Sequence, residues 1–189
     1  ALTFDFNDDS RHHRLPYYAL HADLRPLVSK CQSLQSILSQ KNEFCAFVHS
    51  NPFGPERNRL LTQLSRYKPV VSGGRFRNNL GRQVNDKIEF MRSFKFAFAF
   101  ENESYPGYTT EKLTDALLAN TIPIYWGNEQ IAEEFNPKAF LCRHDFVSNA
   151  ELIDRIIEID GSDELYCDYI AQPAFRDDHL PDGIEDQSV

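Results

Sequence analysis

The sequence predicts an α/β protein in which a parallel sheet is covered by helices on both faces. Three observations support this fold class: short apolar runs alternate with helix-like segments, the clearest strand has aromatic rings on one face and alanines on the other, and glycine-containing turns follow two of the runs. Strands that alternate with helices are joined by right-handed crossovers, which gives a Rossmann-like arrangement. The 189 residues suffice for one full hydrophobic core, whereas two complete domains would be tight.

The expected elements begin at residue 44. Short apolar runs predict strands at residues 44–49, 69–71, 94–100, 121–125 and 139–142. Helical spacing predicts helices at residues 55–66, 85–92, 110–119 and 149–160, with a short helix near Gln130. In the first of these helices, Leu60, Leu61 and Leu64 form one apolar stripe.

The run 94–100 is expected to lie in the middle of the sheet. Its side chains alternate between the two faces, and one face carries Phe94, Phe96, Phe98 and Phe100. The opposite face carries Lys95, Ala97, Ala99 and Glu101. The rings can fill one helical layer, and the alanines allow a helix to approach closely on the other side.

Residues 1–41 differ from the rest of the chain because they could not bury a core of their own. The stretch Ser33–Gln40 is typical of a linker or a short exposed helix. The sequence shows no secretory signal, does not begin with Met and contains no apolar run long enough to span a bilayer. We therefore expect a trimmed chain or a fragment, whose targeting is left open.

The charge and the cysteine content of the sequence argue against nucleic-acid binding and against a cysteine-based metal site. A net charge of −8 and a pI near 5.2 argue against a nucleic-acid partner, but they permit a local basic pocket. The four cysteines form no CxxC pair and no Cys/His metal pattern, and no DxD motif suggests an obligatory metal. Cys45 and Cys142 lie in apolar runs and are expected to be buried thiols of a reducing compartment.

Chemistry is expected where the strand 94–100 ends, because ligands of open parallel sheets bind at the carboxyl ends of strands. A Pro106-Gly107 turn follows the strand, and Thr109 or Thr110 can cap the next helix. Lys112 falls in the first turn, where the helix dipole disfavours a cation unless an anion is also present. The alternatives are a phosphate site at this helix start and a solvated surface lysine.

The stretch from Phe94 to Phe146 resembles the donor-binding signature of α1,3/4-fucosyltransferases (glycosyltransferase family 10). It contains the FEN tripeptide, the segment GYTTEKL, the strand exit IPIYWG and the run FNPKAF in the family's order. Upstream, the likeness continues through Asn51-Pro52, the ERN of residues 56–58 and the glycine-rich region from Ser72 to Gly81. The resemblance implies an inverting enzyme of GT-B type, of which this chain would hold the GDP-fucose-binding half.

Roles carry over from this resemblance one position at a time. Arg57 and Lys112 match cations that hold the diphosphate, and both are expected to reach the surface. Glu111 matches a carboxylate that contacts donor hydroxyls and stabilises positive charge at the anomeric carbon. Asn102 and Tyr108 match residues that line the pocket, and Gly73 and Gly74 would let the backbone approach the nucleotide.

Each of these residues also has a plain structural interpretation. Arg57 could be an exposed helix charge, Glu111 a partner of the helix dipole, and Asn102 a turn residue. Tyr108 could simply cover the end of the sheet.

Two positions depart from the family pattern, since Glu103 and Glu56 place negative charge where the family has serine and a basic residue. The family's general base belongs to its N-terminal domain, and nothing in this chain matches it. His12, His13 and His144 are chemically conceivable bases, but an ordinary surface or interface role is favoured for each.

The resemblance also implies the domain organisation and the partners. We expect residues 1–41 to be the tail of an acceptor domain with a linker, 42–175 the GDP-fucose-binding domain and 176–189 a C-terminal tail. The partners would be GDP-fucose, an N-acetylglucosamine-containing glycan and the missing N-terminal domain, with no obligatory cofactor. Membrane association would come through absent segments, at the inner membrane in a bacterium or the Golgi in a eukaryote, and a bacterial protein could also be cytoplasmic.

Two rival functions stay open. One is a non-catalytic nucleotide-binding fragment or paralogue, and the other is a related glycosyltransferase that uses another nucleotide sugar.

Overall fold

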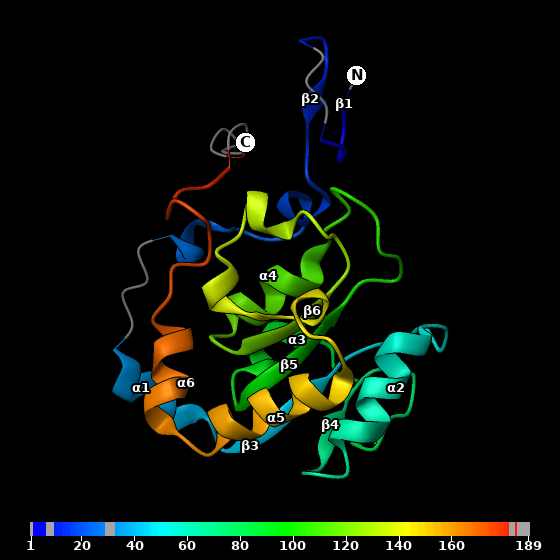
Figure 1. Cartoon of the computed structure of the whole chain (residues 1–189), viewed down its shortest axis with the longest axis vertical. Coiled ribbons are helices and arrows are strands. Elements are labelled where there is room, and N and C mark those ends of the chain that lie inside the picture. The colour runs from blue at the N-terminus through cyan, green and yellow to red at the C-terminus, as the bar shows by residue number, and fades with distance from the viewer. Residues whose placement is uncertain (1, 7–9, 29–32, 182–183, 185–189) are drawn as a thin grey trace.

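The computed structural model describes residues 2–6, 10–28, 33–181 and 184 of the chain. Its centre is a five-stranded parallel sheet (Figure 1). In spatial order the strands are β4 (Val70–Ser72), β3 (Glu43–Phe47), β5 (Phe94–Phe100), β6 (Ile122–Trp126) and β7 (Leu141–Cys142). From β3 the chain first adds β4 on one side and then crosses to β5 on the other. The order of strands therefore reverses between β3 and β5, which is where open α/β sheets form a binding crevice.

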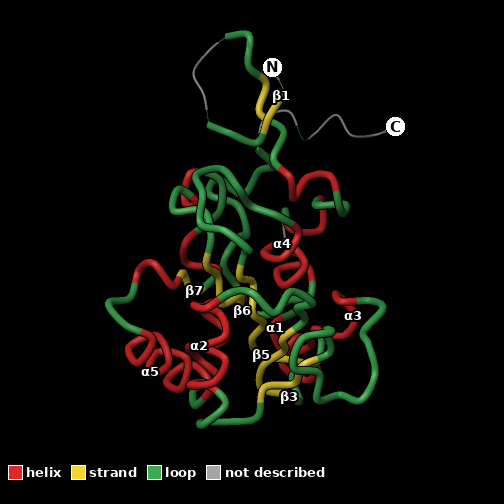
Figure 2. Tube along the Cα trace, turned by 90° about the vertical axis from the view of Figure 1, so that its right-hand side faces the viewer, coloured by secondary structure: helices red, strands yellow, loops and turns green. Residues whose placement is uncertain are grey.

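Helices cover both faces of the sheet, as the sequence predicts (Figure 2). The rings of Phe96, Phe98 and Phe100 pack in one core cluster with side chains from four helices. These helices are α1 (Leu34–Gln40), α2 (Pro55–Leu64), α5 (Asn149–Asp160) and α6 (Asp163–Ile170). Ala97 and Ala99 belong to the clusters that hold α3 (Lys87–Met91) and α4 (Glu111–Leu118). Small side chains under α4 and rings on the opposite face thus account for the two layers.

The first two residues of β5 break the predicted alternation. Phe94 lies against Phe90, with ring centroids 4.9 Å apart, and belongs to the cluster of α3. The ammonium of Lys95 instead reaches Asp160 at the end of α5 and lies over the ring of Tyr166. The physical reason is that these residues begin β5 shortly after α3 ends, and at the start of the strand a long lysine can reach the polar end of α5.

The N-terminal segment packs on the α4 side of the sheet. Its strands β1 (Leu2–Thr3) and β2 (His13–Arg14) form a small parallel pair that projects from the rest (Figure 1). Two 3₁₀ turns follow, Tyr17–Leu20 and Arg25–Leu27, and their side chains Tyr18, Ala19 and Leu27 are buried in the cluster of α4. Arg14 also pairs with Glu134 at 2.7 Å. The expected boundaries at residues 41 and 175 stay predictions.

Several smaller features can be compared with the sequence. The short helix expected near Gln130 is the 3₁₀ turn Ile131–Glu133, and two further 3₁₀ turns lie at Pro137–Ala139 and Arg143–Asp145. Cys45 and Cys142 are buried free thiols, as predicted, and Cys167 is also free. Cys31 lies outside the described residues. Within the described ranges, no helix has the length and apolar character needed to cross a bilayer.

Candidate functional site

A pocket of about 300 Å³ opens at the edge where the parallel strands end. Its walls come from residues 48–51 after β3, from the loop 73–84 after β4, and from Lys87 of α3. Asn102, Glu111 and Lys112 complete it after β5. The pocket thus occupies the place where the strand order reverses, and the sequence predicted five of its residues: Gly73, Gly74, Asn102, Glu111 and Lys112.

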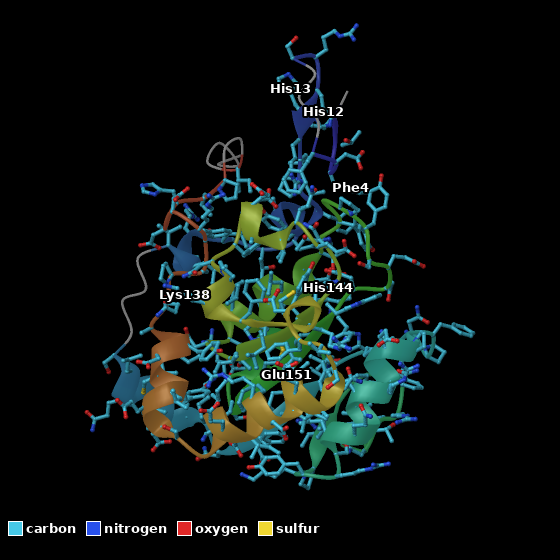
Figure 3. The ribbon with its side chains drawn as sticks, in the orientation of Figure 1. Phe4, His12, His13, Lys138, His144 and Glu151 are labelled. Atoms are coloured by element: carbon cyan, nitrogen blue, oxygen red, sulfur yellow. The ribbon has the colours of Figure 1, made fainter. Side chains whose placement is uncertain are left out.

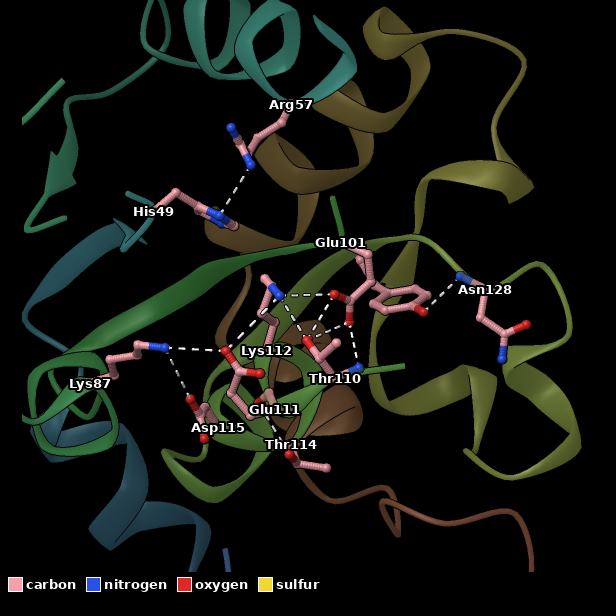
Figure 4. Close-up of polar contacts among 11 residues, drawn as sticks. His49, Arg57, Lys87, Glu101, Thr110, Glu111, Lys112, Thr114, Asp115 and Asn128 are labelled. Atoms are coloured by element: carbon pink, nitrogen blue, oxygen red, sulfur yellow. Dashed lines mark hydrogen bonds and ion pairs between the residues drawn. The ribbon is translucent and has the colours of Figure 1, made fainter. Parts of the chain in front are cut away.

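Lys112 is held at the start of α4 by a carboxylate of the chain itself (Figure 4). Its Nζ lies 2.9 Å from Oε2 of Glu101 and 2.7 Å from Oγ1 of Thr110. Glu101 is buried, and it also accepts hydrogen bonds from the backbone N–H and the hydroxyl of Thr110. A buried carboxylate needs such partners, because an unpaired charge is costly away from water. Glu101 is therefore the anion that makes a cation tolerable at this helix N-terminus.

The capping prediction is right in position and wrong in detail. Thr110 is the N-cap residue of α4, yet its side chain makes no capping hydrogen bond, because its hydroxyl is engaged by Glu101. The FEN glutamate thus fixes both the helix start and the pocket lysine.

Glu111 lies between two ammonium groups. Its Oε1 is 3.3 Å from Nζ of Lys87 and 4.0 Å from Nζ of Lys112 (Figure 4). Burial alone would raise the pKa of Glu111, but Lys112 and Lys87 outweigh it and hold that pKa below its ordinary value. Lys87 also lies 4.0 Å from Oδ2 of Asp115, whose pKa burial raises to about 6 despite the nearby lysine. Two ammonium groups therefore flank one ionised carboxylate, and Arg75 adds a third cation to the pocket lining.

Arg57 is buried rather than surface-reaching, so that expectation is wrong. Its guanidinium donates to the carbonyl oxygens of Asn51 and Phe53, and it lies 3.3 Å from Nδ1 of His49. Because arginine only donates, Nδ1 accepts and the proton of the neutral ring is on Nε2. Burial, followed by the charges of Arg57 and Lys112, lowers the pKa of His49 to about 3. Arg57 thus lies behind the pocket wall and supports the lining residues His49 and Asn51.

Gly73 and Gly74 line the pocket, but the structure gives a different reason for glycine. A Cβ at Gly74 would lie 2.1 Å from the carbonyl oxygen of His49, and one at Gly73 would lie 2.3 Å from Val84. Both contacts are far shorter than packing allows. Glycine is required at position 74 because the loop passes directly against the backbone that follows β3, whereas at position 73 the obstacle is the side chain of Val84 in the same loop.

Comparison with known proteins places this geometry in a family. Residues 38–175 match the sequence model described as glycosyltransferase family 10 (fucosyltransferase) C-term, which covers well over half of the chain. The chain belongs to this family. Among relatives of this family-10 chain, the α-(1,3)-fucosyltransferase FucT of Helicobacter pylori is 37% identical over 172 residues. The 4-galactosyl-N-acetylglucosaminide 3-α-L-fucosyltransferase 9 of Mus musculus is 31% identical over 174 residues.

Solved structures agree with this assignment. The family-10 chain matches a crystal structure of an α1,3-fucosyltransferase with GDP-fucose at a TM-score of 0.80 and 32% identity. A structure of an α1,3-fucosyltransferase with GDP matches at a TM-score of 0.81 and 33% identity. These matches cover 92% of this chain and 61% of the solved ones.

The coverage of the curated relatives is smaller. The alignment with the Helicobacter pylori protein covers 87% of this chain but 36% of that protein. The alignment with the mouse protein covers 89% of this chain but 45% of that protein. The family-10 chain therefore spans between a third and a half of these relatives.

The other predicted residues lie outside the pocket lining. Tyr108 packs against Phe4 of the N-terminal segment, with ring centroids 5.6 Å apart. His13 lies in β2 of the projecting strand pair, and His12 directly before it contacts Thr3 (Figure 3). His144 stacks on Trp126. The two departures from the family pattern, Glu56 and Glu103, are not lining residues either, and Glu56 pairs with Arg59.

Sequence reasoning missed several contributors to the site, among them His49, Lys87, Glu101 and Asp115 and the lining residue Arg75. His49 ends the first predicted strand, and Glu101 is part of the FEN motif, so both carried a usable signal. Lys87 and Asp115 had none, because only the packing of α3 on α4 brings them together. Among the described residues, no three His, Cys, Asp or Glu side chains gather as a metal site.

Proposed function

We propose that this chain is the donor-binding part of an α1,3-fucosyltransferase and that its pocket binds GDP-fucose. The observation that carries the proposal is the placement of Lys87, Glu111 and Lys112 together at the strand-order reversal. A diphosphate needs cations, and a sugar with many hydroxyls needs a hydrogen-bond acceptor beside them. The GDP-fucose-bound and GDP-bound neighbours support the same ligand.

The geometry suggests how each part of the donor would be held. The diphosphate would lie toward Lys112 and the positive end of the α4 dipole. Negative charge develops on the β-phosphate as the bond to the sugar breaks, and a fixed ammonium stabilises it without reorganisation. Glu111 would accept hydrogen bonds from the fucose hydroxyls and stabilise the positive charge that develops at the anomeric carbon.

In the whole protein, fucose would pass with inversion to a hydroxyl of an N-acetylglucosamine-containing glycan. The bond between the anomeric carbon and the phosphate oxygen breaks with its electron pair on GDP, while the acceptor oxygen bonds from the opposite side. The hydroxyl proton would leave to a base outside the pocket, since Glu111 is committed to the donor. A further domain of the whole protein would bind the acceptor glycan.

Calorimetric titration tests the donor assignment on the chain as it stands. We expect GDP and GDP-fucose to bind at one site, and GDP-mannose to bind more weakly than GDP-fucose. UDP-galactose should not bind at comparable concentrations. Binding of the uridine nucleotide alone would favour the rival glycosyltransferase that uses another nucleotide sugar.

A further inference from the structure

Lys87 differs from the other pocket lysine in what it contacts. Lys112 is tied to β5 through Glu101, whereas Lys87 lies on α3 and reaches only the α4 carboxylates Glu111 and Asp115. These are the salt bridges of Lys87 within the described part of the chain, and the partner nearer to its ammonium, Glu111, is only part-buried, unlike Glu101. These contacts therefore suit Lys87 to hold the carboxylate of Glu111 in one orientation.

The contacts of Glu111 are one-sided. In the described residues, its hydrogen bond to Lys87 and its approach to Lys112 both fall on Oε1. A glutamate has three rotatable side-chain bonds, so a single lysine on one oxygen selects one orientation out of several. Holding Oε1 in this way leaves Oε2 as the oxygen that can accept a hydrogen bond from a ligand in the pocket.

The exposure of the two lysine side chains indicates that Lys87 orients Glu111 rather than binding phosphate directly. Each pocket lysine faces two carboxylates, but the side chain of Lys87 is 43% exposed. Lys112 is 18% exposed and lies at the positive end of α4. Solvent screens a half-exposed charge, so Lys87 adds less than Lys112 to the attraction of an anion. Its distinctive effect is on the carboxylate that it contacts.

We propose that Lys87 is a positioning residue that orients Glu111 toward the sugar of the donor, so that the pocket distinguishes a GDP-sugar from free GDP. This inference rests on the proposed function, because it assumes that GDP-fucose occupies the pocket. Lys87 acts through Glu111 and needs no contact with the ligand. Removal of Lys87 should therefore weaken the binding of the sugar and leave the binding of the nucleotide nearly unchanged.

The test compares Lys87→Met, Lys87→Arg and Lys138→Met with the unmodified chain. Lys138 is an exposed lysine outside the pocket lining and serves as the matched control (Figure 3). Calorimetry would measure the dissociation constants of GDP and GDP-fucose for each variant. Lys87→Met should weaken GDP-fucose by up to about fivefold, the range of a part-exposed ion pair, and change GDP by less than about twofold. Lys87→Arg keeps the cation and should restore most of the loss, while Lys138→Met should change neither ligand.

A double-mutant cycle adds a readout that a merely structural effect would not produce. Once Glu111→Gln has removed the charge that Lys87 holds, adding Lys87→Met should weaken GDP-fucose by less than it does in the unmodified chain. Equal weakening of GDP and GDP-fucose by Lys87→Met would overturn the inference, since Lys87 would then act on the diphosphate. Unchanged binding of both would overturn it as well. Failure of the unmodified chain to bind either ligand would instead refute the proposed function.

Discussion

His49 should make the stability of the chain depend on pH between neutrality and mild acid. The side chain is 6% exposed, and Arg57 lies against its Nδ1. Its folded-state pKa is about 3, against an ordinary value of 6.5. The unfolded chain therefore binds a proton on this ring below about pH 6.5 that the folded chain refuses, so stability is present above that pH and is lost as the pH falls.

The size of the effect follows from linkage. Between about pH 7.5 and about pH 5.5, the unfolded ring gains most of a proton while the folded ring gains almost none. The free energy of unfolding should fall by about 1.4 kcal/mol over this interval because of His49 alone. Other groups add their own pH dependence, so the contribution must be isolated by substitution.

His49→Gln removes the titration and keeps an acceptor for the guanidinium of Arg57. Urea unfolding of both chains at the two pH values gives the difference directly. The unmodified chain should lose about 1.4 kcal/mol more than the variant, whatever their absolute stabilities. His13→Gln, at an exposed position, controls for the loss of a histidine as such. Equal losses in the unmodified chain and in His49→Gln would refute the account of a neutral, cation-facing His49.

Two further predictions concern residues that the structure removes from the surface. Arg57→Ala should lower the free energy of unfolding by about 3 kcal/mol, because it removes the hydrogen-bond donor of buried carbonyl groups. Arg59→Ala on the same helix is the control and should change that free energy by less than about 0.5 kcal/mol. Similar urea midpoints for both variants would contradict the buried placement of Arg57. Gly74→Ala should destabilise the chain by about 2 kcal/mol or prevent folding, because its Cβ would clash with the backbone of His49. A Cβ at Gly161 would make only ordinary contacts, so Gly161→Ala should leave the midpoint of thermal unfolding nearly unchanged. A fully stable Gly74→Ala variant would show that the loop packs differently.

The strands could be predicted because their signals are local. Apolar runs such as that of β5 and helical stripes such as that of α2 depend on neighbours in the sequence, and the structure places both as expected. α6 was missed although Ser162 caps it and Tyr166 and Ile170 share its buried face. Its apolar side chains are few, and its acidic start is also typical of a loop.

The site could be predicted only for residues that sequence order alone brings to the pocket, and not for residues that tertiary packing places there. Glu111 and Lys112 begin α4, the helix that follows β5 after one loop, so sequence order alone brings them to the pocket. Arg57 was placed correctly in its helix but misjudged in exposure, because its burial depends on carbonyl groups that a loop turns toward it. Lys87 reaches Glu111 across two helices, and no local pattern encodes such a contact.

A crystal structure of the chain with GDP bound would show directly whether the pocket at the strand-order reversal holds the diphosphate. We expect the diphosphate beside Lys112, with Asn102 near the ligand and Arg57 still behind the wall. A nucleotide bound elsewhere on the chain, or a pocket that stays empty at saturating GDP, would contradict this placement.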